Sequence, residues 1–150
     1  MKPISIAEVE YVAHTLAQKW MTWNEPIPEF KTRSPHILES CLIAPFQRFD
    51  KKYLYQGLIE KASVLFYFMI KNHPFQNGNK RIAVTTLLYF LHKNEKWLRV
   101  SNQELYNFAR WVAESNANVK DATVDAIKKF VTIYVDDLSK VKDTENVQSA

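Results

Sequence analysis

The sequence predicts an all-α protein that folds as a single compact domain of about six helices. Its 150 residues suit one ordinary domain, and a hydrophobic content of 47% can build one core. Glycine occurs only twice, and Asn-Gly, the dipeptide typical of tight β-hairpins, occurs once. Apolar residues instead recur at helical spacing in successive segments of the chain.

The first predicted helix spans about residues 5–20. Ser5 and Glu8 have the spacing of a capping box at its start. Apolar residues then follow at three- and four-residue intervals: Ile6, Val9, Val12 and Leu16. Residues 23–35 contain three prolines in a polar setting, so we expect an extended loop or a short strand there.

The second helix is expected to start at Ser34 and Pro35, which suit the N-cap and the first helical position. Its apolar face continues past Pro45, where the ring should kink or interrupt it. A third helix is expected over about residues 54–71, with Gly57 near its start.

The fourth helix should begin at the end of residues 73–81 and run to about His92. It is apolar on almost every side, so it should lie in the middle of the domain. A second capping box at residues 101–104 opens the fifth helix. Asp121 is expected to cap the sixth helix, whose apolar face reaches Leu138.

Residues 1–138 are therefore predicted to form the domain, and the polar residues 139–150 a disordered tail. The net charge is +4 with a pI near 9.1, but the basic residues are scattered, so direct nucleic-acid binding is not expected. Cys41 is the only cysteine, which excludes an internal disulfide and a cysteine-based zinc site. No secretory signal or apolar run of transmembrane length is visible, so a cytoplasmic location without a membrane partner is expected.

The segment "HPFQNGNKR", residues 73–81, carries more chemistry than a turn between two helices needs. Asn77 and Gly78 tolerate a left-handed backbone. The amides and the dipole at the start of the following helix favour an anion. Lys80 and Arg81 add positive charge where the helix end is already positive, which indicates a negatively charged ligand such as a polyphosphate.

His73 is the side chain of this segment that takes a proton near neutral pH, and it suits the general base for a hydroxyl attacking phosphorus. Asn77 offers an oxygen to a magnesium ion that bridges phosphates, and Phe75 should anchor the loop in the core. From the residues alone, a plain capping loop with solvated cations remains an alternative. The other histidines have no partners at a recognisable spacing and are expected to be structural or solvated: His14, His36 and His92.

The same nine residues resemble the signature of the Fic/Doc superfamily. Fic proteins carry H-x-F-x-[D/E]-G-N-G-R-x-x-R, and the death-on-curing (Doc) branch carries H-x-F-x-[D/N]-[A/G]-N-K-R, which is the form matched here. The matching positions are His73, Phe75, Asn77, Gly78, Asn79, Lys80 and Arg81. The helix lengths and count agree as well, so the resemblance covers roughly residues 1–138.

The resemblance implies a transferase that uses ATP and Mg²⁺ on a protein hydroxyl. Fic enzymes mostly transfer AMP. The Doc toxin instead transfers the terminal phosphate to a threonine of elongation factor Tu and stops translation, and a small antitoxin neutralises it. No [S/T]-x-x-x-E-[G/N] inhibitory motif is evident in either terminal region, so an antitoxin supplied as a separate protein is expected.

Carried across by position, the resemblance makes His73 the general base and Arg81 the phosphate clamp. The backbone of Gly78 and Asn79, with the Asn79 side chain, would form the anion hole. Asn77 would be the metal ligand. The family often has an acid at that position, so a neutral amide implies a lower affinity for magnesium, and a catalytically degenerate member is an alternative.

Two departures from the Fic form favour a protein kinase over AMP transfer. Lys80, counted among both the catalytic and the nucleotide-binding residues, replaces a glycine that lets phosphates lie against the backbone. Val84 replaces the last arginine. The resemblance also makes residues 23–35 a flap that aligns the target peptide, with a plain surface connection as the alternative. A Doc-like kinase toxin is the leading prediction; the alternatives are AMP transfer or an inactive relative, with a basic nucleic-acid binder far behind.

Overall fold

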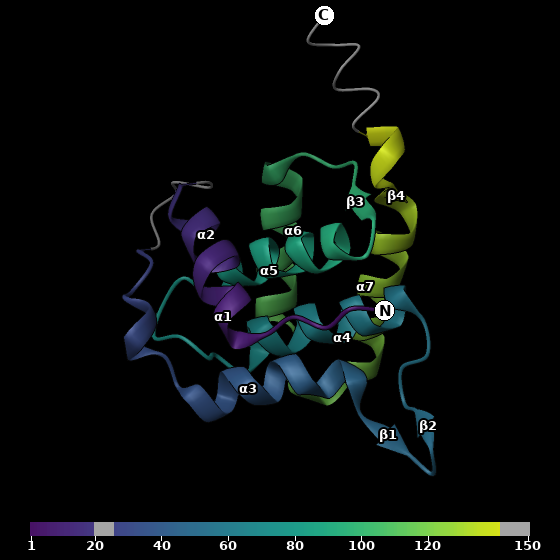
Figure 1. Ribbon diagram of the computed structural model, residues 1–150, viewed down its shortest axis with the longest axis horizontal. Coiled ribbons are helices and arrows are strands. Elements are labelled where there is room, and N and C mark those ends of the chain that lie inside the picture. Colours follow the sequence, from purple (N-terminus) through teal and green to yellow (C-terminus); the bar gives the residue numbers. More distant parts are fainter. Residues whose placement is uncertain (20–25, 142–150) are drawn as a thin grey trace, which may run out of the picture.

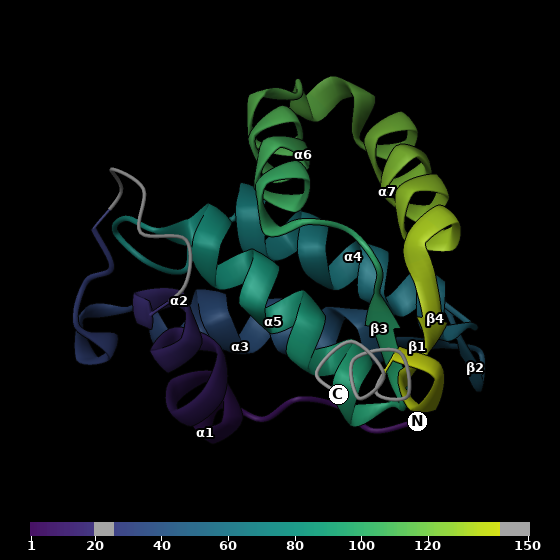
Figure 2. The same cartoon turned by 90° about the horizontal axis from the view of Figure 1, so that it is seen from above.

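The structure is a computed structural model and describes residues 1–19 and 26–141. Helix α5, Asn79–Lys93, lies at its centre, beside α4 (Leu58–Lys71) and between the N-terminal helices and α6 (Asn102–Glu114), as Figures 1 and 2 show. Its apolar side chains are buried: Ile82, Val84, Leu87, Leu88, Phe90 and Leu91. The predicted all-α class and the buried central helix are confirmed.

The first predicted helix is present as one continuous unit with a wider turn in its middle. It consists of α1 (Ile6–Glu8), a π-helical segment (Val9–His14) and α2 (Thr15–Lys19). The Ser5 capping box at its start is formed as predicted. Two side chains of α5 hold this unit: Thr85 Oγ1 donates to the Ala13 carbonyl at 2.7 Å, and Arg81 donates to the Ala17 carbonyl.

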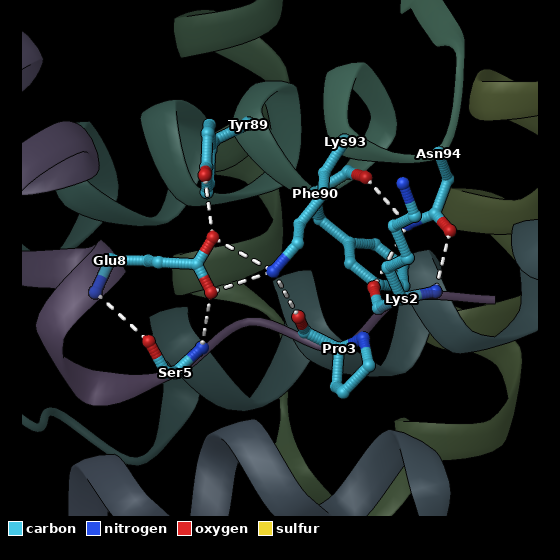
Figure 3. Close-up of polar contacts among 8 residues, drawn as sticks. All are labelled: Lys2, Pro3, Ser5, Glu8, Tyr89, Phe90, Lys93 and Asn94. Atoms are coloured by element: carbon cyan, nitrogen blue, oxygen red, sulfur yellow. Dashed lines mark hydrogen bonds and ion pairs between the residues drawn. The ribbon is translucent and has the colours of Figure 1, made fainter.

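A polar cluster fastens the N-terminal segment to the far end of α5 (Figure 3). Lys93 Nζ lies 2.7 and 2.8 Å from the two carboxylate oxygens of Glu8, and Tyr89 donates to the same group at 2.5 Å. Lys93 also donates to the Pro3 carbonyl at 2.9 Å. Partial burial raises the pKa of Glu8, but the hydrogen bonds from Lys93, Tyr89 and the Ser5 amide outweigh it and lower the pKa to about 2.

Helix α3, Pro35–Ile43, ends in a 3₁₀ turn, Ala44–Phe46, so the predicted interruption at Pro45 is confirmed. The predicted start of the next helix near residue 54 is wrong. Helix α4 begins at Leu58, with Gly57 as its N-cap and not within it.

An antiparallel hairpin precedes α4, with strands β1 (Arg48–Phe49) and β2 (Lys52–Tyr53). Its two loop residues, Asp50 and Lys51, have φ values of +50° and +66°, and neither is a glycine or asparagine. The sequence therefore lacks the usual hairpin signal. Cation–π contacts support the hairpin instead: the Tyr53 ring lies 4.4 Å from the guanidinium of Arg48, its cross-strand partner, and 4.2 Å from Nζ of Lys61 in α4.

Helices α6 and α7 (Lys120–Tyr134) rise from the layer of α4 and α5 (Figure 2). Ser101 caps α6 by accepting from the Glu104 amide at 3.1 Å, which is the serine half of the predicted capping box. The predicted cap of α7 is wrong, since the N-cap position is Val119 and Asp121 lies in the first turn.

The sequence predicted that the apolar face of α7 reaches Leu138, but the helix ends at Tyr134. The helix stops because β4 (Val135–Asp137) pairs antiparallel with β3 (Lys96–Leu98). Ion pairs between Lys96 and Asp137, and between Arg99 and Asp136, accompany this pairing.

One hydrophobic core cluster extends from Ile4 to Val131. Residues 138–141 form a helical turn, and the rest of the predicted tail, 142–150, lies outside the described residues. Within residues 1–19 and 26–141, every helix is too short or too polar to cross a membrane.

Candidate functional site

The predicted catalytic histidine sits where α4 ends. Asn72 is the C-cap of α4, and the next residue, His73, has a φ of +50°. Glycine usually fills this left-handed position after a helix, because a Cβ there costs about 1–2 kcal/mol. His73 is exposed to solvent. A strained, exposed histidine is a feature that the fold alone does not require.

The loop after His73 is fixed by the side-chain amide of Asn79, the first residue of α5. The Phe75 amide donates to Asn79 Oδ1 at 3.0 Å, and Asn79 Nδ2 donates to the Phe75 carbonyl at 2.8 Å. The Phe75 ring is 2% exposed and packs against the rings of His14 and Phe30, both 5.9 Å away. The predicted anchor is therefore confirmed.

Asn79 also joins the two ends of the loop. Its Nδ2 lies 3.4 Å from His73 Nδ1. The predicted general base and the start of α5 are thus in contact, although five residues separate them in the sequence. The Asn79 side chain is 7% exposed and is engaged with Phe75 and His73. Its predicted part in an anion hole stays a prediction.

Gly78 is the N-cap of α5 and has a φ of +72°. A Cβ at this position would lie 2.6 Å from Cδ1 of Ile27 and 3.1 Å from the Pro26 carbonyl oxygen. Both the backbone conformation and the close approach of the segment 26–28 therefore require glycine. Figures 1 and 2 show this segment running beside the loop between α4 and α5.

The first turn of α5 carries the two predicted phosphate-binding cations. Arg81 is 4% exposed, and its guanidinium reaches the Ala17 carbonyl in the middle of α2. Lys80, next to it, is half-buried. Both residues stand at the positive end of the helix dipole, where amides of the first turn have no acceptor within the helix.

A sequence model of the Fic/DOC family matches residues 3–91, which is more than half of the chain and includes the whole loop. The chain belongs to the Fic/DOC family. Fic domains are generally transferases that act on proteins, and they typically use ATP with Mg²⁺. No curated protein and no solved structure matches the chain.

The side-chain oxygen of Asn77 is the atom of the loop that the prediction assigns to a magnesium ion. Asn77 Oδ1 accepts from the Gly78 amide at 2.9 Å, which leaves one lone pair of this oxygen. Within residues 1–19 and 26–141, no three His, Cys, Asp or Glu side chains gather as a metal site. Magnesium fits here only when nucleotide phosphates supply most of its ligands.

Two further positions of the motif, 81 and 84, are buried. Val84, at the position of the last Fic arginine, has no exposed surface and lies in the core cluster. Arg81, one helical turn earlier, is held against α2. The arginine pair of the Fic form is thus reduced to one residue, whose side chain is fixed by the first helical unit.

The predicted flap is described from Pro26 onward, and residues 20–25 lie outside the described part. Of the two expected alternatives, a loop and a short strand, the structure shows a loop over 26–34, with a 3₁₀ turn at Phe30–Thr32. The Ser34 amide donates to the Pro74 carbonyl at 2.8 Å and fastens the segment to the loop.

His14 was expected to be structural or solvated, and it is structural. It is 6% exposed, its Nε2 lies 2.7 Å from the Pro28 carbonyl oxygen, and its ring meets Phe30 edge-on. His36 and His92 are exposed. Sequence reasoning missed how Ile27 and His14 support the loop, because neither has a local signal: their partners are 51 and 61 residues away, at Gly78 and Phe75.

Proposed function

We propose that the chain is a Doc-like toxin of a toxin–antitoxin module, acting as a protein kinase. It transfers the terminal phosphate of ATP to a serine or threonine hydroxyl of a target such as elongation factor Tu, and so inhibits translation. One observation carries the proposal: an exposed histidine in a strained conformation lies 3.4 Å from the first residue of a buried helix whose start bears two cations.

In the transfer, the target hydroxyl oxygen bonds to the γ-phosphorus while its proton passes to His73. The bond from the γ-phosphorus to the bridging oxygen breaks, and ADP leaves. The amides at the start of α5, Lys80 and Arg81 stabilise the charge on the phosphates. Magnesium would neutralise the phosphates further, with Asn77 as the protein ligand.

The choice of kinase over AMP transfer rests on Lys80 and Val84. A glycine at position 80 would let a nucleotide lie against the backbone, whereas the lysine fills that space with a cationic chain. Val84 is fully buried and carries no charge. The second phosphate contact, which the last arginine makes in the Fic form, is therefore lost at this position. AMP transfer remains the second candidate.

Labelled ATP distinguishes the two reactions. The purified protein is incubated with bacterial extract and ATP labelled at either the γ- or the α-phosphate, with His73→Ala as the control. We expect label on a protein only from γ-labelled ATP, and none with the control. Label from the α position alone would replace the kinase by AMP transfer. No label from either, together with growth arrest that survives His73→Ala, would indicate an inactive relative.

We also propose that a small antitoxin acts on this protein as a separate chain. Co-expression of a small protein encoded next to this gene should restore growth that the chain alone arrests. A chain that arrests growth equally with and without that small protein would contradict this part of the proposal.

A further inference from the structure

The Asn79 side chain has an orientation that its neighbours determine. A backbone N–H only donates and a backbone C=O only accepts. The Phe75 amide therefore identifies the facing atom of Asn79 as Oδ1, at 3.0 Å, and the Phe75 carbonyl identifies the other atom as Nδ2, at 2.8 Å. A flipped amide would place like groups against each other at both contacts.

This orientation decides which atom of Asn79 faces the histidine. Nδ2 carries two hydrogens, and the Phe75 carbonyl accepts one of them. The second donates to His73 Nδ1 at 3.4 Å. A nitrogen that accepts a hydrogen bond carries a lone pair and no hydrogen, so neutral His73 has its proton on Nε2.

We infer that Asn79 is a positioning residue that selects the tautomer of His73, with the lone pair on Nδ1 facing the start of α5 and the hydrogen on Nε2. The inference rests on the proposed function in one respect, that His73 is the base. Asn79 acts through His73, and its side chain contributes to the loop and the ring rather than to phosphate binding. The Asn79 amide then covers the lone pair of the base in the resting protein, so the target hydroxyl must replace this amide at Nδ1 before its proton can pass to His73.

The burial of Asn79 supports this role. Asn79 is 7% exposed and closes a ring of contacts with Phe75, so its side chain is held where Nδ2 faces the imidazole. His73 itself is exposed, and within the described residues its ring has one hydrogen-bond partner, Asn79. Asn79 is therefore the group that can set its tautomer. Within residues 1–19 and 26–141, Asn79 is the residue through which the helix start acts on the imidazole.

Nitrogen-15 NMR of the histidine rings tests the inference in the protein without nucleotide. Spectra are recorded at about pH 9, where imidazoles are neutral. The His73 signals are assigned by their loss in His73→Gln. We expect the Nε2–H form to dominate in the wild-type protein. Asn79→Ala should lower the ratio of Nε2–H to Nδ1–H by about threefold to tenfold, the effect of one neutral hydrogen bond.

Asn79→Asp provides the sharper comparison, because a carboxylate only accepts. It should draw the hydrogen to Nδ1 and reverse the ratio. Asn77→Ala is the matched control, since the Asn77 side chain bonds to the Gly78 amide in the same loop, and the ratio should stay at its wild-type value.

Two results would overturn the inference: a wild-type ring with its hydrogen on Nδ1, or a ratio that is the same in the wild type and Asn79→Ala. The first needs no Asn79 variant, only the His73→Gln spectrum for assignment, so it decides the matter even if the Asn79 variants do not fold. Neither readout involves phosphate transfer, so failure here is distinct from failure of the kinase proposal.

Discussion

The two ends of α5 carry similar residues in opposite electrostatic settings. At the C-terminal end, Lys93 stands at the negative end of the helix dipole and contacts both oxygens of Glu8 (Figure 3). At the N-terminal end, Lys80 and Arg81 stand at the positive end, next to a histidine with a φ of +50°. The first arrangement stabilises the fold by ordinary complementarity. The second goes against local preference, which is the pattern expected where function constrains the residues.

His73 offers the strongest test of this contrast. His73→Ala and His73→Gly should both reduce transfer by about 10²–10⁴-fold, because a general base is lost. Only glycine relieves the left-handed backbone, so His73→Gly should also raise the free energy of unfolding over His73→Ala by about 1 kcal/mol. The measurements are the labelling assay and urea denaturation. A His73→Gly protein that keeps its activity would remove the histidine from the mechanism.

The two glycines of the chain test the backbone of the site. Gly78→Ala should lower the free energy of unfolding by about 2 kcal/mol, through its positive φ and the contact with Ile27. Gly57→Ala is the control: a Cβ there meets nothing within 4 Å, and it should cost less than about 1 kcal/mol. Equal effects in thermal denaturation would show that Ile27 does not press on the loop.

Glu8 tests the opposite end of α5. Its pKa in the folded protein, about 2, lies below its ordinary value of 4.5, so the cluster stabilises the fold above about pH 4.5 and loses this contribution as the pH falls toward 2. With allowance for solvent screening, the wild type should lose about 1–2 kcal/mol more than Glu8→Gln between pH 5 and 2.

Urea denaturation across that pH range measures the Glu8 effect. Glu39→Gln, at an exposed position of α3, is the control and should keep the wild-type pH dependence. Parallel pH profiles for the wild type and Glu8→Gln would mean that the cluster contributes nothing. Transfer activity at neutral pH should survive Glu8→Gln, in contrast with His73→Ala.

The sequence predicted the six main helices and the chemistry of the loop because both depend on neighbouring residues. Capping at Ser5 and Ser101, and the apolar surface of α5, are local signals. The β1–β2 hairpin was missed because contacts outside its own turn, such as Lys61 of α4 against Tyr53, support it, and the β3–β4 pair was missed because its strands are far apart in the sequence. The tie between Asn79 and His73 was also missed, because motif positions give no distances between side chains.

The smallest expected effect concerns magnesium at the N-terminal end. Asn77→Asp keeps an acceptor for the Gly78 amide and adds a negative charge, and Mg²⁺ prefers carboxylate oxygens. The magnesium concentration for half-maximal transfer should fall by about threefold to tenfold. Gln76→Glu places the same charge on an exposed neighbour and should leave it unchanged. If both variants shift the requirement equally, the charge acts on the loop as a whole and Asn77 is not a ligand. A shift in Asn77→Asp alone would indicate that this end of α5 binds a metal–nucleotide complex, whereas the carboxylate at the other end is engaged by Lys93 and Tyr89.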